Sequence, residues 1–261
     1  AMNLRIAGVL HRRMGRTAEA LERYRKVIDF DPRDEEARTG LLDLVSGDDC
    51  AVDAALALEA VFVASGENDK LIDILRRQAD LATDQITRAT LLVRAGAVQS
   101  ERLGQHEGAL RDVSDALAAV PGYGPALDLL SGVAAAGNVW QAAYAVVATA
   151  VEDVIDDDDV ARMRRLAGDI AFEHLNDPTS AALHYGAYLL IDPDCDEVLA
   201  RQDQIFGQLG RRDDQVKVLR QRLALAGDAA DSALKMRLAE MLVENSRDPD
   251  SAFELVKGVL T

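Results

Sequence analysis

The sequence repeats itself, and this repetition limits the folds that it can adopt. Met2–Asp34 has the pattern of two short helices that are joined at Gly15 and ended by Asp31-Pro32. Small residues at fixed intervals let two helices approach closely, and larger residues fill the space around the contact. The small residues are Ala7, Gly8 and Ala20, and the larger ones are Leu4, Tyr24 and Val27. Proline ends the unit because it disfavours helix in the residue before it.

A longer period is visible in the prolines that end later units. Pro121 and Pro193 are 72 residues apart, which is the length of two helix pairs. Pro32 and Pro121 are 89 residues apart, so there is room for one additional helix, which we place within residues 34–64. The pattern predicts about fifteen helices in alternating directions, joined by turns of ordinary length.

These residues resemble the tetratricopeptide repeat, a helix–turn–helix unit of about 34 residues. The resemblance is sharpest in residues 2–34, 89–123 and 163–194, although Leu4 stands at the family's tryptophan position and His11 at its tyrosine position. It implies an all-α fold, namely a right-handed α-solenoid of antiparallel helix pairs in a divergent form that we associate with bacterial proteins.

The pattern predicts a single array of these repeats over the whole chain, residues 1–261. Its predicted sub-units are 1–83, 84–155, 156–227 and 228–261, and the last of them is shorter than the others. Both ends fall inside helical patterns, so we expect the chain to be a piece of a longer protein.

The first helices of the later pairs are longer than the first helix of the array. Ala167 to Asn176 spans nine residues, whereas Gly8 to Gly15 spans seven. An inserted residue turns the helix face by about 100°. We therefore expect such a helix to bulge or twist in order to keep its apolar face in the core.

Composition restricts the class of partner. The chain has 45 Asp and Glu against 29 Lys and Arg, a net charge of −16. Nucleic acid and acidic membrane surfaces are disfavoured, since both require a basic face. No apolar run is long enough to span a membrane. Two distant cysteines, Cys50 and Cys195, indicate a reducing compartment, and we expect the cytoplasm.

In this family the first helices of the pairs line a concave groove for a peptide or protein. Carried over by position, the resemblance implies ten groove residues: Arg5, Val9, Arg12, Val93, Ala97, Glu101, Arg164, Gly168, Met236 and Glu240. The set is mixed in charge and lacks the lysine and asparagine clamp with which some members bind a peptide carboxylate.

Few residues carry the pattern of a chemical site. Thr17, Asp84 and the run Asp156–Asp159 precede helices, where oxygen side chains cap free backbone N–H groups; a cation site at the acidic run is the weaker alternative. His174, His184 and Cys195 could approach one another, but a zinc site needs three or four ligands at suitable spacing. We predict packing or surface roles for the histidines, core packing for Tyr185 and Tyr188, packing between repeats for Trp140, and no metal, cofactor or catalytic residue.

The resulting hypothesis is a non-enzymatic scaffold for protein–protein interaction. One alternative is a regulatory repeat module of a larger enzyme, such as a kinase, whose catalytic domain lies outside this piece. The other is an RNA-binding helical repeat, which the net charge of −16 disfavours.

Overall fold

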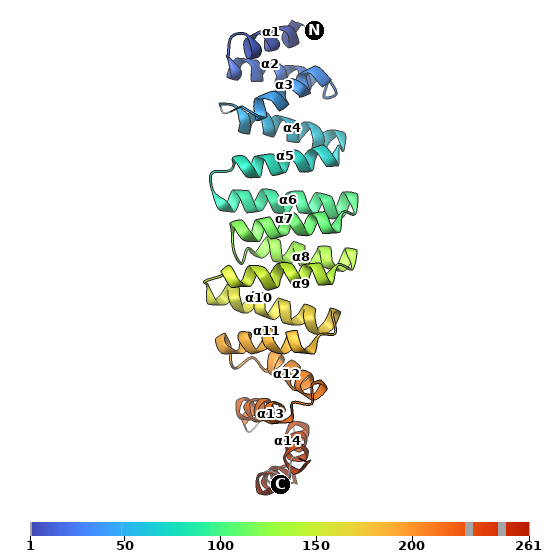
Figure 1. Ribbon diagram of the computed structural model, residues 1–261, viewed down its shortest axis with the longest axis vertical. Coiled ribbons are helices and arrows are strands. Elements are labelled where there is room, and N and C mark those ends of the chain that lie inside the picture. The colour runs from blue at the N-terminus through green and yellow to red at the C-terminus, as the bar shows by residue number, and fades with distance from the viewer. Residues whose placement is uncertain (1, 48, 228–231, 245–248, 261) are drawn as a thin grey trace. The chain divides into compact units, whose positions relative to one another are not determined.

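The structure, a computed structural model, describes residues 2–47, 49–227, 232–244 and 249–260. Within these ranges it contains fifteen α-helices and no strand, which confirms the predicted all-α class (Figure 1). Contacts join the helices of the pairs α1–α2, α4–α5, α6–α7, α10–α11, α12–α13 and α14–α15, so the tetratricopeptide-like organisation is confirmed as well. The right-handed sense of the solenoid stays a prediction.

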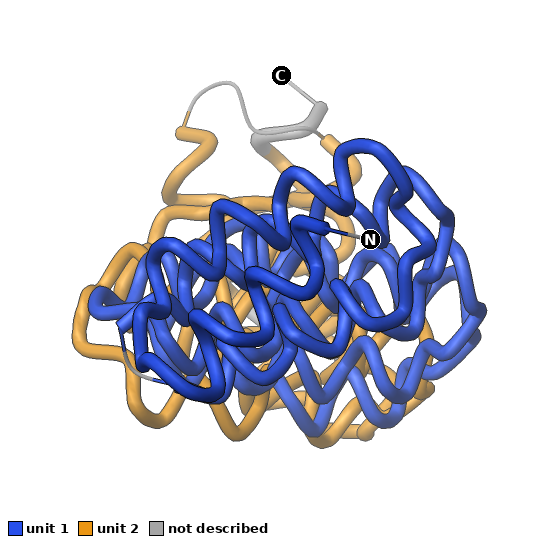
Figure 2. The backbone as a smooth tube through the Cα atoms, turned by 90° about the horizontal axis from the view of Figure 1, so that it is seen from above, with its two compact units in different colours: residues 1–146 blue, residues 147–261 orange. Residues whose placement is uncertain are grey.

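The chain forms two compact units, residues 1–146 and 147–261 (Figure 2). The first unit contains α1 (Met2–Arg12), α2 (Thr17–Phe30), α3 (Glu35–Val45), α4 (Ala51–Ser65), α5 (Asn68–Leu81), α6 (Gln85–Leu103), α7 (His106–Ala119) and α8 (Gly124–Gly137). The boundary falls inside α9 (Trp140–Ala150). The second unit contains α10 (Asp157–Asp169), α11 (Pro178–Ile191), α12 (Asp196–Gln208), α13 (Arg212–Ala226), α14 (Ser232–Glu244) and α15 (Pro249–Leu260). The finer division into four sub-units stays a prediction.

A residue with left-handed backbone conformation ends the first helix of most pairs, and we call it the turn residue. The turn residues are Gly15, Gly66, Gly104, Asn138, Asn176 and Gly210, with φ between 51° and 70°. Glycine and asparagine suit this conformation because they tolerate positive φ better than other residues. From Gly66 onward the turn residues are 38, 34, 38 and 34 residues apart, which explains the 72-residue period.

The additional helix is α3. Because Gly66 joins α4 to α5 and Gly15 joins α1 to α2, α3 is left between two pairs without a partner of its own. It lies within residues 34–64, where the proline spacing predicts it. Asp34 caps its first turn, accepting a hydrogen bond from the Ala37 amide at 2.8 Å.

The expected bulge is present at the end of α10. Ile170–His174 form a π-helical turn, in which the Leu175 amide donates to the Ile170 carbonyl at 3.1 Å. A π-helical turn absorbs one extra residue. As a result Ala167, Ile170 and Ala171 all remain buried, and the prediction of a bulge is confirmed.

Two of the three predicted caps are confirmed. Asp84 accepts from the Thr87 amide at 2.8 Å, and Asp156 accepts from the amides of Asp158 and Asp159 at 3.1 and 3.2 Å. The assignment of Thr17 is wrong: it is the first residue of α2, and the preceding Arg16 makes no side-chain capping bond.

The core contains the recurring small and large residues of the pattern. Ala20, Ala109 and Ala181 occupy equivalent positions and are fully buried, and Tyr24, Val113 and Tyr185 pack beside them. Tyr188 is buried and Trp140 is half-buried. Two leucines of the first unit, Leu42 on α3 and Leu56 on α4, are exposed although they stand beside the core leucines Leu41 and Leu58.

Candidate partner-binding surface

One helix stripe faces solvent on the first helices α1, α4 and α8, is partly buried on α6 and α12, and is interrupted on α10, where Ile170 is buried. It consists of the residues ten, six and three positions before the turn residue, and we call it the open stripe. On α1 these residues are Arg5, Val9 and Arg12, all exposed, as the groove prediction requires. On α8 they are Asp128, Gly132 and Ala135, also exposed. The spacing of three and four residues keeps the stripe on one helix face.

The groove prediction for α6 is displaced by one residue. Glu101 belongs to the open stripe and is exposed, but Val93 and Ala97 are half-buried. The stripe residue next to Val93 is Arg94, which is exposed, whereas the one next to Ala97 is Val98, which is half-buried. One residue corresponds to about 100° of rotation around the helix, so the predicted pair lies toward the packed side.

The prediction for α10 needs a larger correction. Gly168 is buried, and a Cβ atom at this position would lie 2.7 Å from Cε1 of Tyr185, so the glycine makes room for the tyrosine and has no groove surface. Arg164 is half-buried, pairs with Glu152 at 2.8 Å and lies 3.4 Å from Nδ1 of His184. Burial and the Arg164 charge lower the pKa of His184.

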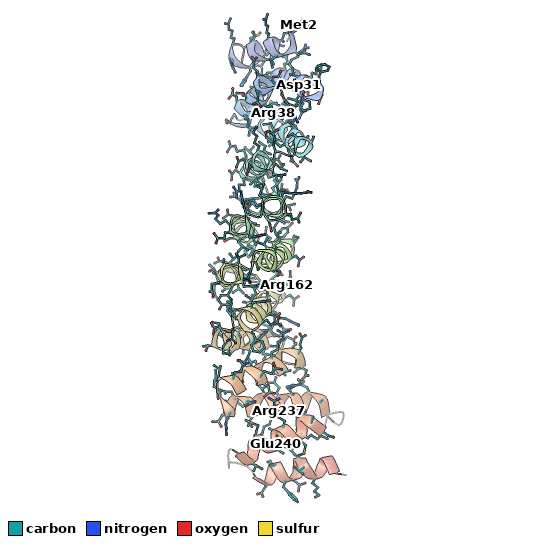
Figure 3. All side chains as sticks on the ribbon, turned by 90° about the vertical axis from the view of Figure 1, so that its right-hand side faces the viewer. Met2, Asp31, Arg38, Arg162, Arg237 and Glu240 are labelled. Carbon is teal, nitrogen blue, oxygen red and sulfur yellow. The ribbon has the colours of Figure 1, made fainter. Side chains whose placement is uncertain are left out.

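On α14, Met236 and Glu240 are exposed. Figure 3 labels Glu240 and the nearby Arg237 on this helix. Whether any predicted groove residue contacts a partner stays a prediction.

The open stripe of α4 is apolar. Leu56, Ala60 and Val63 are exposed, and Val52 extends the stripe by one turn. The same positions on α12, counted from Gly210, carry Ala200, Gln204 and Gly207, with Asp196 one turn earlier. Because α12 has a polar or small stripe at these positions, packing of the array does not require the apolar residues on α4.

A second group of residues, missed by the sequence analysis, lies seven positions before the turn residue. An acid stands there on α4 (Glu59), α10 (Asp169) and α12 (Asp203), and we call these three residues the joint acids. Each pairs with an arginine of the next pair's first helix: Glu59 with Arg94, Asp169 with Arg201 at 2.8 Å, and Asp203 with Arg237 at 2.9 Å. The joint acids therefore fasten one pair to the next.

The ion pair between Asp169 and Arg201 is part of a half-buried polar network that also includes Tyr185. Tyr185 donates to Asp169 at 2.6 Å, and Arg201 donates to the Tyr185 hydroxyl at 3.0 Å. Burial raises the pKa of Asp169 and of Tyr185, and the neighbouring carboxylate raises the tyrosine pKa further. Such perturbed groups are common at catalytic sites; here each of them has a hydrogen-bond partner within the chain.

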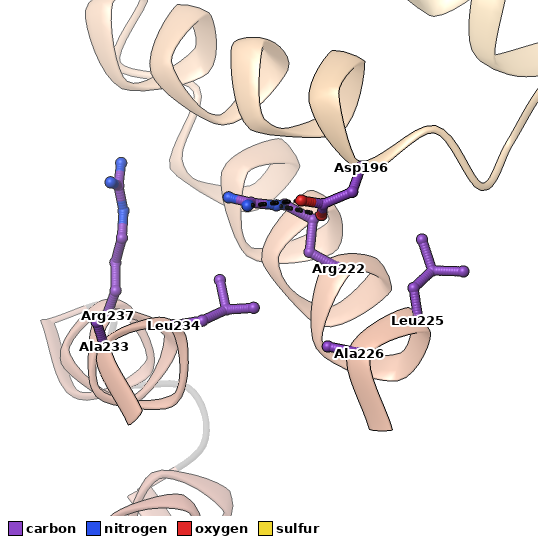
Figure 4. A pocket seen from close by; sticks show the side chains of 7 residues that line it. All are labelled: Asp196, Arg222, Leu225, Ala226, Ala233, Leu234 and Arg237. Atoms are coloured by element: carbon purple, nitrogen blue, oxygen red, sulfur yellow. Dashed lines mark hydrogen bonds and ion pairs between the residues drawn. The ribbon is translucent and has the colours of Figure 1, made fainter. Parts of the chain in front are cut away.

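A cavity of about 530 Å³ lies between the start of α12, the end of α13 and the start of α14 (Figure 4). Arg222 and Arg237 line it. Arg222 binds Asp196 through two hydrogen bonds of 2.7 and 3.1 Å, and Arg237 binds Asp203. Since a carboxylate already neutralises each guanidinium, the cavity offers little free charge to an anionic ligand.

Neither a metal-binding cluster nor a membrane-spanning helix is found in the part of the chain that the structure describes. There, His, Cys, Asp and Glu side chains do not gather in groups of three that could bind a metal ion, His174, His184 and Cys195 included. No helix in the described ranges is both long and apolar enough to cross a bilayer.

The chain is only remotely similar to proteins of known structure. No family model matches the sequence, and no curated protein matches it significantly. A structure of MamA from Desulfovibrio magneticus RS-1, residues 41 to the end, is 14% identical, with 66% of this chain and 93% of that chain covered and a TM-score of 0.41. YrrB, a TPR protein with an unusual peptide-binding site, is 12% identical, with coverage of 66% and 84% and a TM-score of 0.43. The C-terminal part of a TPR repeat-containing protein from Cytophaga hutchinsonii is 10% identical, with coverage of 91% and 93% and a TM-score of 0.43. These values are too low to support any statement about a partner.

Proposed function

We propose that this chain is a protein–protein interaction scaffold whose open stripes, above all that of α4, bind an apolar polypeptide segment. The observation that carries the proposal is the exposed apolar row Val52, Leu56, Ala60 and Val63. A helix that is apolar all round is normally buried. Here α4 is apolar on both its packed and its open face, so its open face has the character of a contact surface.

The neighbouring charges are already paired and would not dominate binding. Asp53, beside the stripe, lies 3.6 Å from Arg25, and Glu59 is engaged by Gln78 at 2.7 Å and by Arg94. A partner on this face would therefore be held mainly by burial of apolar surface, which contributes about 25 cal/mol per Å². The cytoplasmic location stays a prediction.

The test is a double substitution on the stripe. Leu56→Asp with Val63→Asp should weaken binding of the native partner at least about tenfold, because both apolar contacts are lost and two charges are introduced. Binding is measured by affinity capture from the source cell followed by titration of the purified partner. The control is Gln204→Asp on the corresponding stripe of α12, where Gln204 is the counterpart of Ala60, and it should leave the affinity unchanged.

Both variants should retain the wild-type thermal unfolding curve, since the substituted side chains are exposed. Equal affinity of the double variant and the wild type would exclude α4 as the binding surface.

A further inference from the structure

The solvent-facing side of α11 is apolar, whereas the other second helices carry charged or small residues there. The residues seven and fourteen positions after the turn residue are exposed in all six pairs that have one. At seven positions they are Glu22, Asp73, Arg111, Ala145, Leu183 and Lys217, and at fourteen they are Asp29, Asp80, Ala118, Glu152, Leu190 and Ala224. Among these six pairs, only that of α11 has a large apolar side chain at either position.

The exposed leucines of α11 form a stripe that packing of the array does not require. Leu183 and Leu190 are 68% and 87% exposed, and Ala187 lies between them. We call these three residues the α11 stripe; their spacing of four and three residues keeps them on one helix face. Four other pairs fold with a charged residue at the position of Leu183. The α11 stripe therefore has the character of a contact surface.

The α11 stripe lies inside the array and is not left open by the end of the chain. Both α10 and α12 pack against α11. The next helix, α13, also reaches this pair, because Gln221 donates to the Pro193 carbonyl at 2.7 Å. Ala181 and Tyr185, on the packed side of α11, are fully buried. The stripe is thus a second face of a helix whose packing within the array is complete.

Carboxylates without a cation gather at the C-terminal end of α11. Asp192 follows the helix directly and accepts a hydrogen bond from Tyr188 at 2.8 Å, and Asp194 is exposed two residues later. Figure 1 shows the start of α10 at the same end of this pair, where Asp157 and Asp158 are exposed. Within the described part of the chain, no lysine or arginine pairs with any of these four carboxylates. This end of the stripe therefore attracts positive charge.

We propose that the α11 stripe binds the apolar face of an amphipathic helix of a partner protein, with lysine or arginine in the last turn of that helix beside Asp192 and Asp194. Apolar residues spaced by four and three positions on the partner match the spacing of the α11 stripe. Basic residues are most favourable near the C-terminal end of a helix, because of its dipole. The partner helix therefore lies parallel to α11.

The charge of the chain favours this partner over a second copy of the chain. A second copy would bring a net charge of −16 and the same carboxylates to the contact, and like charges repel. The inference does not depend on the α4 stripe, because it concerns a different helix in the other compact unit.

The experiment uses a labelled synthetic helical peptide of alanine and glutamine, with three leucines spaced by four and three residues and two lysines in its last turn. We expect saturable binding to the full chain by fluorescence anisotropy. Leu183→Ser with Leu190→Ser should weaken binding at least about tenfold, because the apolar contact is lost.

A charge reversal tests the acidic end of the stripe. Asp194→Lys should weaken binding of the peptide about threefold or more, the size expected for an exposed ion pair. A peptide with glutamates in place of the two lysines should bind Asp194→Lys more tightly than the wild type. A merely structural effect of the substitution would not produce this exchange of preference.

Two controls locate the binding surface. Phe30→Ser with Leu42→Ser changes two exposed apolar residues of the first unit and should leave peptide affinity unchanged. Leu56→Asp with Val63→Asp should also leave it unchanged, which separates this surface from that of α4. All variants should keep the wild-type thermal unfolding curve, since the substituted side chains are exposed.

Four results would overturn the proposal. They are absence of peptide binding, equal affinity of Leu183→Ser with Leu190→Ser and the wild type, an equal loss in either control, and self-association through Leu183 and Leu190 that the peptide does not disrupt. The last result, measured by analytical ultracentrifugation, would make a second copy the occupant of the stripe.

Discussion

Gly168→Leu should lower the free energy of unfolding by about 3 kcal/mol, the upper end of the usual range for overpacking a core. A Cβ atom at this position would lie 2.7 Å from Cε1 and 2.8 Å from Cδ1 of Tyr185. The ring cannot move away easily, because Tyr185 is fully buried and its hydroxyl is bonded to Asp169 and Arg201. The measurement is urea unfolding followed by far-ultraviolet circular dichroism.

A matched change elsewhere separates crowding from an effect of leucine itself. Gly132 is also inside a helix, but a Cβ there would have no atom within 4 Å. Gly132→Leu should therefore leave stability unchanged or raise it by up to about 1 kcal/mol through helix propensity. Adding Tyr185→Val to Gly168→Leu should recover part of the loss, since Val113 fills the equivalent position of α7. Equal midpoints for Gly168→Leu and the wild type would contradict this account.

The helix pairs were predictable because their signals are local. Proline ends helices, and glycine or asparagine occupies the left-handed turn, so the 72-residue period, the additional helix and the bulge at Ile170–His174 follow from counting residues. Open and buried faces were harder to assign. The residues of α4 are apolar on all sides of the helix. Its sequence therefore has no periodicity that distinguishes the exposed Leu56 from its buried neighbour Leu58.

The groove residues of α6 and α10 were misplaced for a related reason. Carrying the pattern over from the first helix gave Val93 and Gly168. Counting backward from Gly104 gives the exposed Arg94 on α6, but on α10 the residue six positions before Asn176 is Ile170, which lies in the π-helical turn and is buried. In the longer first helices these two ways of counting differ, and an error of one residue rotates the position by about 100°. The joint acids were missed because pairing with the next helix depends on contacts between repeats. A count from each turn residue would have found them at seven positions before Gly66, Asn176 and Gly210.

Arg76→Leu should lower the free energy of unfolding at neutral pH by about 2–3 kcal/mol, because it leaves a buried carboxylate without its cation. Arg76 on α5 donates to both oxygens of Asp112 on α7, at 2.8 and 3.2 Å, and Gln99 on α6 donates to the same carboxylate. The Asp112 side chain is 3% exposed, but that of Arg76 is 40% exposed, which keeps the expected loss below that for a fully buried pair.

The loss should depend on pH, and its direction follows from the pKa of Asp112. Burial raises this pKa, while Arg76 and Gln99 lower it, so removing Arg76 raises it further. A carboxyl group whose pKa is higher in the folded than in the unfolded state binds more protons when folded, so stability falls as pH rises through the folded pKa. The deficit of Arg76→Leu relative to the wild type should therefore be largest at neutral pH and shrink under mildly acidic conditions. Urea midpoints at the two pH values measure it.

Two further variants test the assignment to Asp112. Adding Asp112→Asn to Arg76→Leu should restore part of the stability at neutral pH and remove the pH dependence of the deficit, because the amide is neutral and can still bond to Gln99. Arg77→Leu removes the neighbouring arginine, whose hydrogen bond to the Val45 carbonyl is long at 3.5 Å, and it should cost less than about 1 kcal/mol. A deficit of Arg76→Leu that is the same at both pH values would show that lost packing, and not the unpaired carboxylate, causes the effect.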